Sequence, residues 1–523
     1  MQKLKRRAYI NRDRLPVIVV VLSVAILLFG VFLLNFRKGD APGDIDRFSA
    51  ETKDGAIELS WRNPKMEKGS AVALQIQSEG TDLAITLPAY ADSYTFLGGE
   101  HGTAYTFTVS VTGADGHKSK GQQGKAMFLN LNAVPDLPLL SIQTVNGEEP
   151  ACVLDEKPEG CVGVGITGNE YVKGELSLIE HGDTQIHTQM RFRIRGNTPD
   201  RLKTPYKIKL DRALDLLQRE DESYQDTDWA LLSYGTDFVF PAGLFVSRLC
   251  QFEWQPAFEF VNLMVNGDWR GCYLLVESVG RGEGRLDVSD DGFIIENDAY
   301  WWNTGGAYFK TDKLQNEKHR EMGYTFKYPD IADDTDERLL AVKQYMDAFE
   351  TALYNGDPSY SEYIDVQSFA NWLLFQDIMA SWDGSGTNMF LYKYDFDPQN
   401  PTSTKIKMGP AWDLESACTE EYRNRWATVH ENSVMYFKQL LTFSDFKDAY
   451  KASWREVSGG LWNETKEYLN RMLKEKGEAL RESWQMDGRR WGYEITDPYE
   501  QAEELVQWFA ARESWMEQAV SGL

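Results

Sequence analysis

The chain has 523 residues, more than one ordinary domain contains, so two or more folded units are expected. Hydrophobic residues make up 42% and aromatic residues 13% of the sequence, which excludes a chain that is disordered throughout. The formal net charge of -25 argues against nucleic acid or anionic lipid head groups as partners and favours basic peptides or cations.

The first apolar segment, residues 17–36, predicts a transmembrane signal anchor. It reaches the roughly 20 residues that a helix needs to cross a bilayer. Most of the nearby basic residues precede it, so the tail of residues 1–16 is expected in the cytoplasm. A cleaved signal peptide is the alternative, and Asn35-Phe36-Arg37-Lys38 stands where its cleavage site would be. We therefore expect a single-pass cell-membrane protein whose C-terminal domains, after a linker at residues 37–45, are extracellular.

Residues 46–130 predict a small β-sandwich. Apolar and polar residues alternate in Ala56–Trp61 and again in Tyr105–Val111, with turn signals between the runs. At these residues the segment resembles a fibronectin type III module, with Trp61 in the core and Tyr105 placed like the tyrosine of the sixth strand. The resemblance implies a spacer or a binding module, and no catalytic grouping is present in it.

Residues 137–523 predict an α+β domain, because strand patterns come first and helical patterns follow. Asn266-Gly267 predicts a hairpin between two of the strands. The expected strands are Gln189–Ile194, Tyr206–Leu210, Phe258–Val265, Trp269–Val276 and Gly292–Ile295. The expected helices are Glu337–Tyr354, a second one capped by Asp365 and ending at Ile378, and most of the chain from Tyr436 onward.

The five cysteines match no zinc-binding pattern. Cys152 and Cys161 flank a polar stretch and could close a small disulfide loop outside the cell. The other three are expected to be buried thiols.

Asp383-Gly-Ser-Gly-Thr-Asn388 is the first candidate for chemistry. It lies between the Asp365 helix and an expected strand at Met389–Tyr394. In kinases an Asp accepts the proton of the substrate hydroxyl, and an Asn five positions later binds a metal from the same loop. A turn made of residues that tolerate a left-handed backbone explains the spacing as well.

The segment that follows strengthens the kinase interpretation. Lys405–Met408 is expected to pair with the first strand and to lead into Asp413-Leu-Glu415. Kinases hold a metal-binding Asp at the end of such a strand pair. Asn388, Asp413 and Glu415 are therefore candidate metal ligands, and their oxygen atoms suit Mg²⁺, Mn²⁺ or Ca²⁺.

Candidate phosphate-binding groups lie upstream. Alternation in Pro205–Leu210 puts Lys207 and Lys209 on one strand face, from which either could contact phosphates or simply face solvent. Arg195 begins a turn that could cover phosphates. No P-loop or kinase glycine-loop motif is present.

These segments resemble the spore coat protein H (CotH) kinase family over roughly residues 137–520. The resemblance rests on motifs in a fixed order: Arg195-Gly-Asn197, Pro205-Tyr-Lys-Ile-Lys-Leu210, Asp228-Trp-Ala-Leu-Leu232, Val265 to Glu277, Lys327-Tyr-Pro-Asp330, Asp383 to Asn388, Gly409-Pro-Ala-Trp-Asp413 and Arg512-Glu-Ser-Trp515. It implies an atypical protein-kinase-like fold and transfer of the ATP γ-phosphate to Ser or Thr of a protein. The net negative charge of the chain favours a basic, Ser/Thr-rich acceptor by charge complementarity. The resemblance also implies Asp383 as base, Asn388 and Asp413 as metal ligands and Lys209, with Lys207 as runner-up, as a phosphate contact. Glu277, which ends one of these motifs, could pair with the lysine or be a surface or strand-end carboxylate.

One departure from the family leaves a second hypothesis open. The family usually has W-D-x-D, whereas Glu415 follows Asp413 here, and the longer side chain changes the reach toward a metal. The alternative is a non-catalytic surface protein that binds a cell-wall or matrix ligand, for which Trp301-Trp302 offers candidate contacts.

Overall fold

The structure is a computed structural model that describes residues 41–130, 137–159, 161, 163–196, 202–303, 305–311, 315–316, 320–384, 387–431 and 435–523. These residues form two compact units. The first unit ends at Phe128, and the second continues from Leu129 to Leu523. The short segments Thr52–Gly55 and Glu100–Thr103 group with the second unit.

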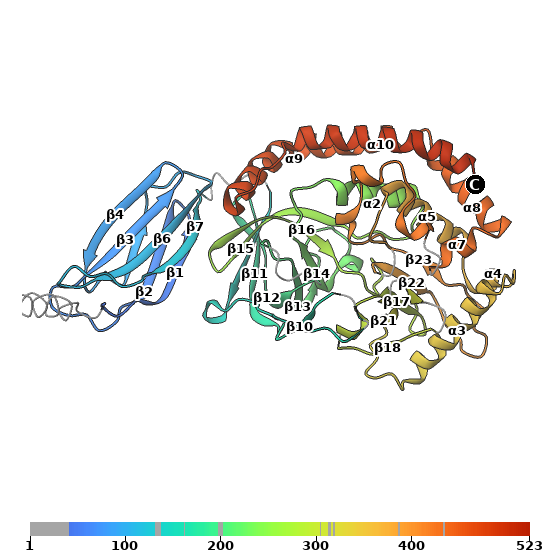
Figure 1. The fold of residues 1–523 in the computed structure, drawn as a ribbon, viewed down its shortest axis with the longest axis horizontal. Coiled ribbons are helices and arrows are strands. Elements are labelled where there is room, and N and C mark those ends of the chain that lie inside the picture. The colour runs from blue at the N-terminus through green and yellow to red at the C-terminus, as the bar shows by residue number, and fades with distance from the viewer. Residues whose placement is uncertain are drawn as a thin grey trace, which may run out of the picture. The chain divides into compact units, whose positions relative to one another are not determined.

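The first unit consists of two sheets that share one apolar core (Figure 1). One sheet has the order β1 (Asp46–Lys53), β2 (Ala56–Arg62), β5 (Ser93–Phe96), and the other β4 (Thr81–Pro88), β3 (Ala71–Ser78), β6 (Thr103–Thr112), β7 (Gln122–Phe128). Trp61 is buried in this core, and its indole N–H donates to the Ala91 carbonyl at 3.0 Å. Tyr105 is buried beside Phe96, with 4.9 Å between the ring centroids.

The transmembrane helix in the predicted fold class requires a correction. In the part of the chain that the structure describes, no helix is both long and apolar enough to span a bilayer. The observed architecture there is a β-rich N-terminal region followed by a domain of strands and C-terminal helices. Residues 17–36, from which the span was predicted, lie outside the described residues.

The second unit begins with a seven-stranded closed barrel (Figure 1). Its order is β11 (Val172–Glu180), β12 (Asp183–Ile194), β13 (Tyr206–Leu214), β14 (Asp226–Leu232), β16 (Asp268–Glu277), β15 (Phe258–Val265) and β8 (Leu139–Thr144). Neighbouring strands are antiparallel except β15 and β8, whose parallel pairing closes the ring. Alternate residues of every strand fill the interior, among them Phe192, Tyr206 and Ile208. The alternation predicted for Tyr206–Leu210 is confirmed.

The predicted hairpin is also present, between β15 and β16. Asn266 and Gly267 occupy the turn with φ of 50° and 77°, the left-handed region that an Asn-Gly hairpin turn needs. A separate two-stranded sheet is formed by β9 (Val153–Asp155) and β10 (Gly165–Thr167). Cys152 and Cys161 on either side of β9 are free thiols, as are the other three cysteines.

A five-stranded sheet follows the barrel in the same unit. Its order is β18 (Tyr308–Phe309), β21 (Gly323–Tyr328), β17 (Phe293–Asp298), β22 (Met389–Lys393) and β23 (Lys407–Met408). A further short pair is β19 (Gln315–Asn316) with β20 (Arg320–Glu321). One face of the five-stranded sheet packs on the large core of the unit through Ile295, Tyr324 and Leu391.

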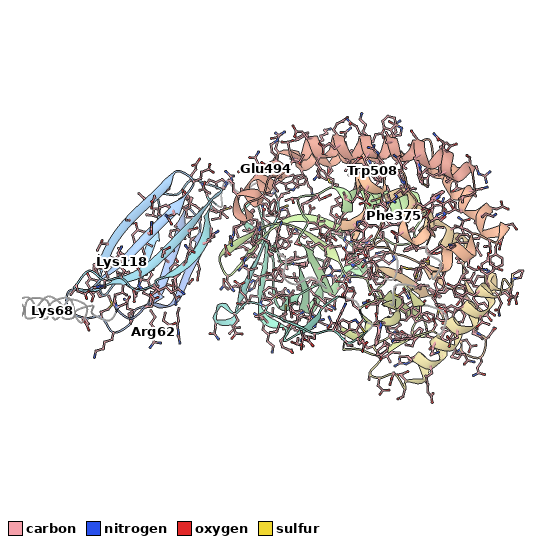
Figure 2. The ribbon with its side chains drawn as sticks, viewed as in Figure 1. Arg62, Lys68, Lys118, Phe375, Glu494 and Trp508 are labelled. Atoms are coloured by element: carbon pink, nitrogen blue, oxygen red, sulfur yellow. The ribbon has the colours of Figure 1, made fainter. Side chains whose placement is uncertain are left out.

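The helices cover this sheet and one side of the barrel. They are α2 (Val239–Leu249), α3 (Glu337–Tyr354), α4 (Tyr360–Tyr363), α5 (Val366–Met379), α6 (Thr428–Glu431), α7 (Tyr436–Leu440), α8 (Ser444–Val457), α9 (Leu461–Trp491) and α10 (Pro498–Ser521). Asp365 caps α5 as predicted, because its side chain accepts the Ser368 N–H at 2.9 Å. The long helices α9 and α10 run along one side of the unit (Figure 1). Phe375 of α5 and Trp508 of α10 are both buried in the large core (Figure 2).

Candidate functional site

The loop after α5 carries the first two predicted site residues. Asp383 and Asn388 are both half-buried, and the Thr387 hydroxyl donates to the Asp383 carbonyl at 3.0 Å. The loop passes very close to α5 at Gly384, where a Cβ would lie 2.6 Å from the Gln376 side-chain oxygen. A larger residue at this position would require the Gln376 side chain to move.

The segment that carries Asp413 lies against the same loop. Strand β23 pairs with β22 through Leu391 and Met408, and the next residue, Gly409, donates its N–H to the Phe390 carbonyl at 3.1 Å. Beyond Asp413, the Cys418 N–H donates at 2.8 Å to the carbonyl of Met379, which is the last residue of α5. The structure therefore brings the two predicted metal-binding segments together at one end of α5.

Left-handed backbone is concentrated in these two segments. Ala380, Asn388, Asp413 and Cys418 have φ of 49°, 60°, 51° and 56°. Each such residue costs free energy relative to an ordinary conformation, and strained residues of this kind gather at functional sites. Since none of the four is glycine, the surrounding contacts must hold the loops in place.

A buried hydrogen-bonded cluster supplies part of that support. The Asp377 carboxylate, on the last turn of α5, accepts from His430 Nδ1 at 2.7 Å, the Tyr450 hydroxyl at 2.7 Å and the Ala427 N–H at 3.0 Å. The fully buried Arg512 of α10 donates through Nε to the Asp377 carbonyl at 2.9 Å. Burial lowers the pKa of Arg512 to about 10, against the charge of Asp377, so it remains a cation at neutral pH.

The two candidate lysines share one carboxylate on the outer face of the barrel. Lys207 Nζ lies 3.1 Å and Lys209 Nζ 3.6 Å from the Asp228 carboxylate on β14. Burial alone would raise the pKa of Asp228, but the charges of the two lysines prevail and lower it. Glu277 does not make the predicted pair with either lysine, since Arg219 Nη2 donates to its buried carboxylate at 2.6 Å.

Arg195 connects the barrel with the Asp413 segment. Its guanidinium carbon lies 5.0 Å from the ring centroid of Trp412, the residue before Asp413. This contact places the predicted phosphate-covering turn beside the predicted metal-binding segment, although the two are more than 200 residues apart in the sequence.

A charged cluster on the five-stranded sheet lies at the same place and was not predicted. Lys327 Nζ on β21 is 2.7 Å from a Glu296 carboxylate oxygen on β17. Asp298, two residues along β17, is buried, and its burial together with the nearby Glu296 charge raises its pKa to about 6. The Lys327-Tyr-Pro-Asp330 motif was a signal for this cluster, but nothing in the sequence indicated its partner strand.

The oxygen ligands fit a divalent metal that takes its remaining ligands from substrate. Asn388 and Asp413 offer one amide and one carboxylate, as is usual where Mg²⁺ also binds phosphates. Among the described residues, no group of three or more His, Cys, Asp or Glu side chains could hold a metal by itself. Glu415 is exposed, and its charge adds to the effect of burial in raising the pKa of Asp237, at the start of α2.

Trp301 and Trp302, the candidate contacts of the alternative hypothesis, are half-buried. The Trp301 ring centroid lies 4.3 Å from that of Tyr308, and the Lys310 ammonium lies 3.7 Å from the Trp301 ring. Packing therefore accounts for much of the surface of Trp301.

Comparison with solved structures finds neighbours for the N-terminal part. A fibronectin type III domain of human collagen alpha-1(XX) is 14% identical and has a TM-score of 0.16, and the aligned part covers 18% of this chain and 91% of the collagen domain. An Fn3-like protein of Clostridium thermocellum is 22% identical, covers 17% of this chain and 95% of its own, and has a TM-score of 0.14. No curated protein matches the chain.

A family model described as CotH kinase protein matches residues 192–516. The match includes the barrel from the end of β12 onward, the five-stranded sheet and almost all of the helices. It also includes every predicted site residue, from Arg195 to Glu415. Since it covers more than half of the sequence, the chain belongs to the CotH kinase family.

Proposed function

We propose that the chain is an atypical protein kinase that transfers the γ-phosphate of ATP to Ser or Thr hydroxyls of a protein. Membership of the CotH kinase family implies a kinase-like function, and the family generally implies ATP and a divalent metal. The observation that carries the proposal is the meeting of two loops at the end of α5, where the Cys418 N–H of the second loop donates to the carbonyl of Met379, the residue at which the first loop begins. These loops carry Asp383 and Asn388 on one side and Asp413 on the other.

The residues of the two loops are suited to different roles. Asp383 accepts the proton of the acceptor hydroxyl and aligns that hydroxyl for attack. Asn388 and Asp413 hold the divalent metal, with Glu415 as a further candidate from the exposed side. The bound metal supplies neutralisation of the phosphate charges. Lys209, or Lys207 on the same strand face, contacts phosphates, and this contact replaces part of its ion pair with Asp228. Arg195, at the end of β12, contacts the phosphates as well.

A basic Ser/Thr-rich protein is the expected acceptor. The net charge of -25 attracts cationic segments and repels nucleic acid. Positioning of the acceptor and electrostatic stabilisation supply most of the acceleration in such a reaction.

The test uses the full chain with labelled ATP, Mg²⁺ or Mn²⁺ and a Ser-rich basic peptide. We expect Asp383→Asn to lower label transfer about 100-fold or more, in the range that general base catalysis contributes. Asp413→Asn should abolish the metal dependence of any residual transfer. Asp397→Asn, an exposed carboxylate in the β22–β23 turn, is the matched control and should leave transfer unchanged. Undiminished transfer in both Asp383→Asn and Asp413→Asn would show that these roles are wrong.

A non-catalytic binding protein is the second candidate, favoured by the exposed Glu415 in place of a second Asp. Thermal denaturation distinguishes the two. A rise in melting temperature that requires ATP and metal together supports the kinase, because a ligand that binds only the native state stabilises it. An unchanged melting temperature supports the binding protein.

A further inference from the structure

The face of the five-stranded sheet that carries Glu296 also carries a cation that has no role in the predicted site. Glu296 is the register partner of both Phe390 and Thr325, so these three side chains share a face. Asn297 pairs with Met389, and therefore the next positions at that end of the two strands are Asp298 and Asn388. The proposed metal-binding Asn388 is thus the residue just before β22, two positions from Phe390, the partner of Glu296.

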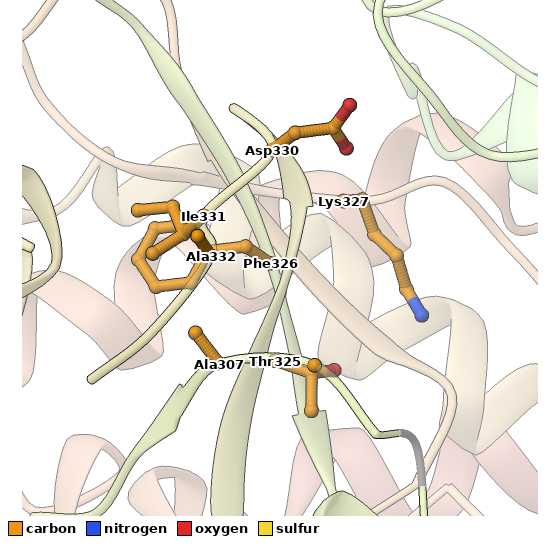
Figure 3. A pocket seen from close by; sticks show the side chains of 8 residues that line it. Ala307, Thr325, Phe326, Lys327, Asp330, Ile331 and Ala332 are labelled. Atoms are coloured by element: carbon orange, nitrogen blue, oxygen red, sulfur yellow. The ribbon is translucent and has the colours of Figure 1, made fainter.

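Lys327 reaches this face through an irregularity in β21. The register between β17 and β21 shifts so that Ile295 pairs with Phe326 and Ile294 with Tyr328, which leaves Lys327 as an extra residue. Such bulges redirect a side chain and are common beside active sites. Figure 3 shows the Lys327 ammonium and the Phe326 ring on opposite sides of the strand. A cavity of about 460 Å³ adjoins the same strand and is lined by Ala307, Thr325, Phe326, Lys327, Asp330 and Ile331.

The ammonium of Lys327 is held in place by an ion pair, and its side chain is only partly buried. Glu296 holds it at 2.7 Å, and 32% of the Lys327 side chain remains exposed, against 13% of Glu296. Burial opposes the charged form of Lys327, but the Glu296 carboxylate prevails and raises its pKa, so the side chain is a cation at neutral pH. The Nζ atom lies 6.0 Å from the ring centroid of Phe390, whose carbonyl accepts the Gly409 N–H.

A second cation from the barrel lies within electrostatic range. The charge of Arg195 acts on Lys327 and disfavours its protonated form. Arg195 is at the same time stacked on Trp412, beside Asp413. Two cations held near each other repel, and an anion placed between them removes that cost and gains two charge-assisted contacts.

We propose that Lys327, positioned by Glu296, contacts the phosphate groups of the nucleotide together with Arg195. This inference rests on the proposed function. It adds a phosphate contact from the sheet, on the side of the site where Asn388 and Asp413 lie, to the barrel lysines predicted from the sequence. Glu296 acts through Lys327, and neutralising it would free the ammonium without removing it.

The test is the dissociation constant of Mg²⁺-ATP, and separately of adenosine, measured by calorimetry on the full chain. We expect Lys327→Met to weaken ATP binding about 10- to 100-fold, the effect of losing one contact to a charged group. Adenosine binding should change less than 3-fold, because adenosine has no phosphate. Glu296→Gln should alter the apparent KM for ATP with little change in kcat.

Lys407→Met is the matched control. Lys407 lies on β23 of the same sheet, is paired with Glu253, and exposes 33% of its side chain. Equal losses in Lys407→Met and Lys327→Met, or equal losses of ATP and adenosine binding in Lys327→Met, would overturn the inference. So would ATP binding in Lys327→Met within about 3-fold of the original chain. If the original chain itself binds no ATP, the proposed function fails, and the inference fails with it.

Discussion

Replacing Arg512 tests whether the end of the chain supports the two candidate loops. Its guanidinium donates to the carbonyl oxygens of Asp377, Arg423 and Tyr422, the last two at 2.7 and 3.3 Å. Arg512→Met removes these charge-assisted hydrogen bonds, each of which contributes about 1.5–3 kcal/mol. The buried Asp377 carbonyl and the partly buried Tyr422 carbonyl keep the Ala380 and Arg425 N–H groups, each at 3.1 Å. Some of this cost is recovered by relaxation, so we expect the free energy of unfolding to fall by about 3–5 kcal/mol.

The assay is urea denaturation of the full chain followed by tryptophan fluorescence, with label transfer measured well below the transition. Arg512→Lys should recover part of the stability, because one ammonium can serve some of the acceptors but lacks the planar fork. Arg455→Met on α8 is the control, since this exposed arginine donates to a single carbonyl, and its effect should stay within about 0.5 kcal/mol. A loss of less than about 1 kcal/mol in Arg512→Met would refute the reasoning.

Three further predictions concern stability. Burial raises the pKa of Glu350 from 4.5 to about 7, so the free energy of unfolding of the original chain should fall by about 3 kcal/mol as the pH rises from 4.5 to 8. Glu350→Gln lacks this ionisation, so its stability relative to the original chain should rise by the same amount between the two pH values. Lys203 Nζ lies 2.5 Å from the buried Asp487 carboxylate, and Lys203→Met should cost about 3–5 kcal/mol in urea denaturation. Gly384→Ala, whose Cβ would meet Gln376, should cost about 1–3 kcal/mol and reduce label transfer.

Each of these has its own control. An equal gain of Glu350→Gln at both pH values would contradict the burial argument. Adding Asp487→Asn to Lys203→Met should restore part of the lost stability, because the unpaired buried charge is removed. For Gly384→Ala, a stability equal to that of the original chain would mean that the loop path is not fixed by contact with Gln376.

Local features of the fold were predictable because they depend on neighbours in the sequence. The helix at Glu337–Tyr354, the cap at Asp365 and the Asn266-Gly267 hairpin all follow from periodicity, capping and turn chemistry. The pairing of β22 with β23 was likewise predictable, since the two strands are consecutive in the chain and joined by a single loop, residues 394–406.

Features that join distant segments were not predictable in this way. The closure of the barrel by β8 and β15 depends on a parallel pairing across more than 100 residues. The contact of Lys327 with Glu296 needs the register shift in β21, which leaves no mark in the residue pattern. For Glu277 the sequence left open a pair with a lysine or a place at the surface, whereas its buried carboxylate accepts from Arg219.

The closed barrel also couples chemistry to packing. In an open sheet an edge strand can shift its register without breaking pairing on both sides, whereas a closed barrel has no edge strand. A register shift of one residue in β13 would place Tyr206 and Ile208 on the outer face of the barrel. The same shift would bury Lys207 and Lys209 in the apolar interior, where the charged form of neither side chain is stable. The apolar interior of the barrel therefore determines on which face Lys207 and Lys209 lie, and mutations that loosen this packing should disturb the positions of both lysines before they unfold the protein.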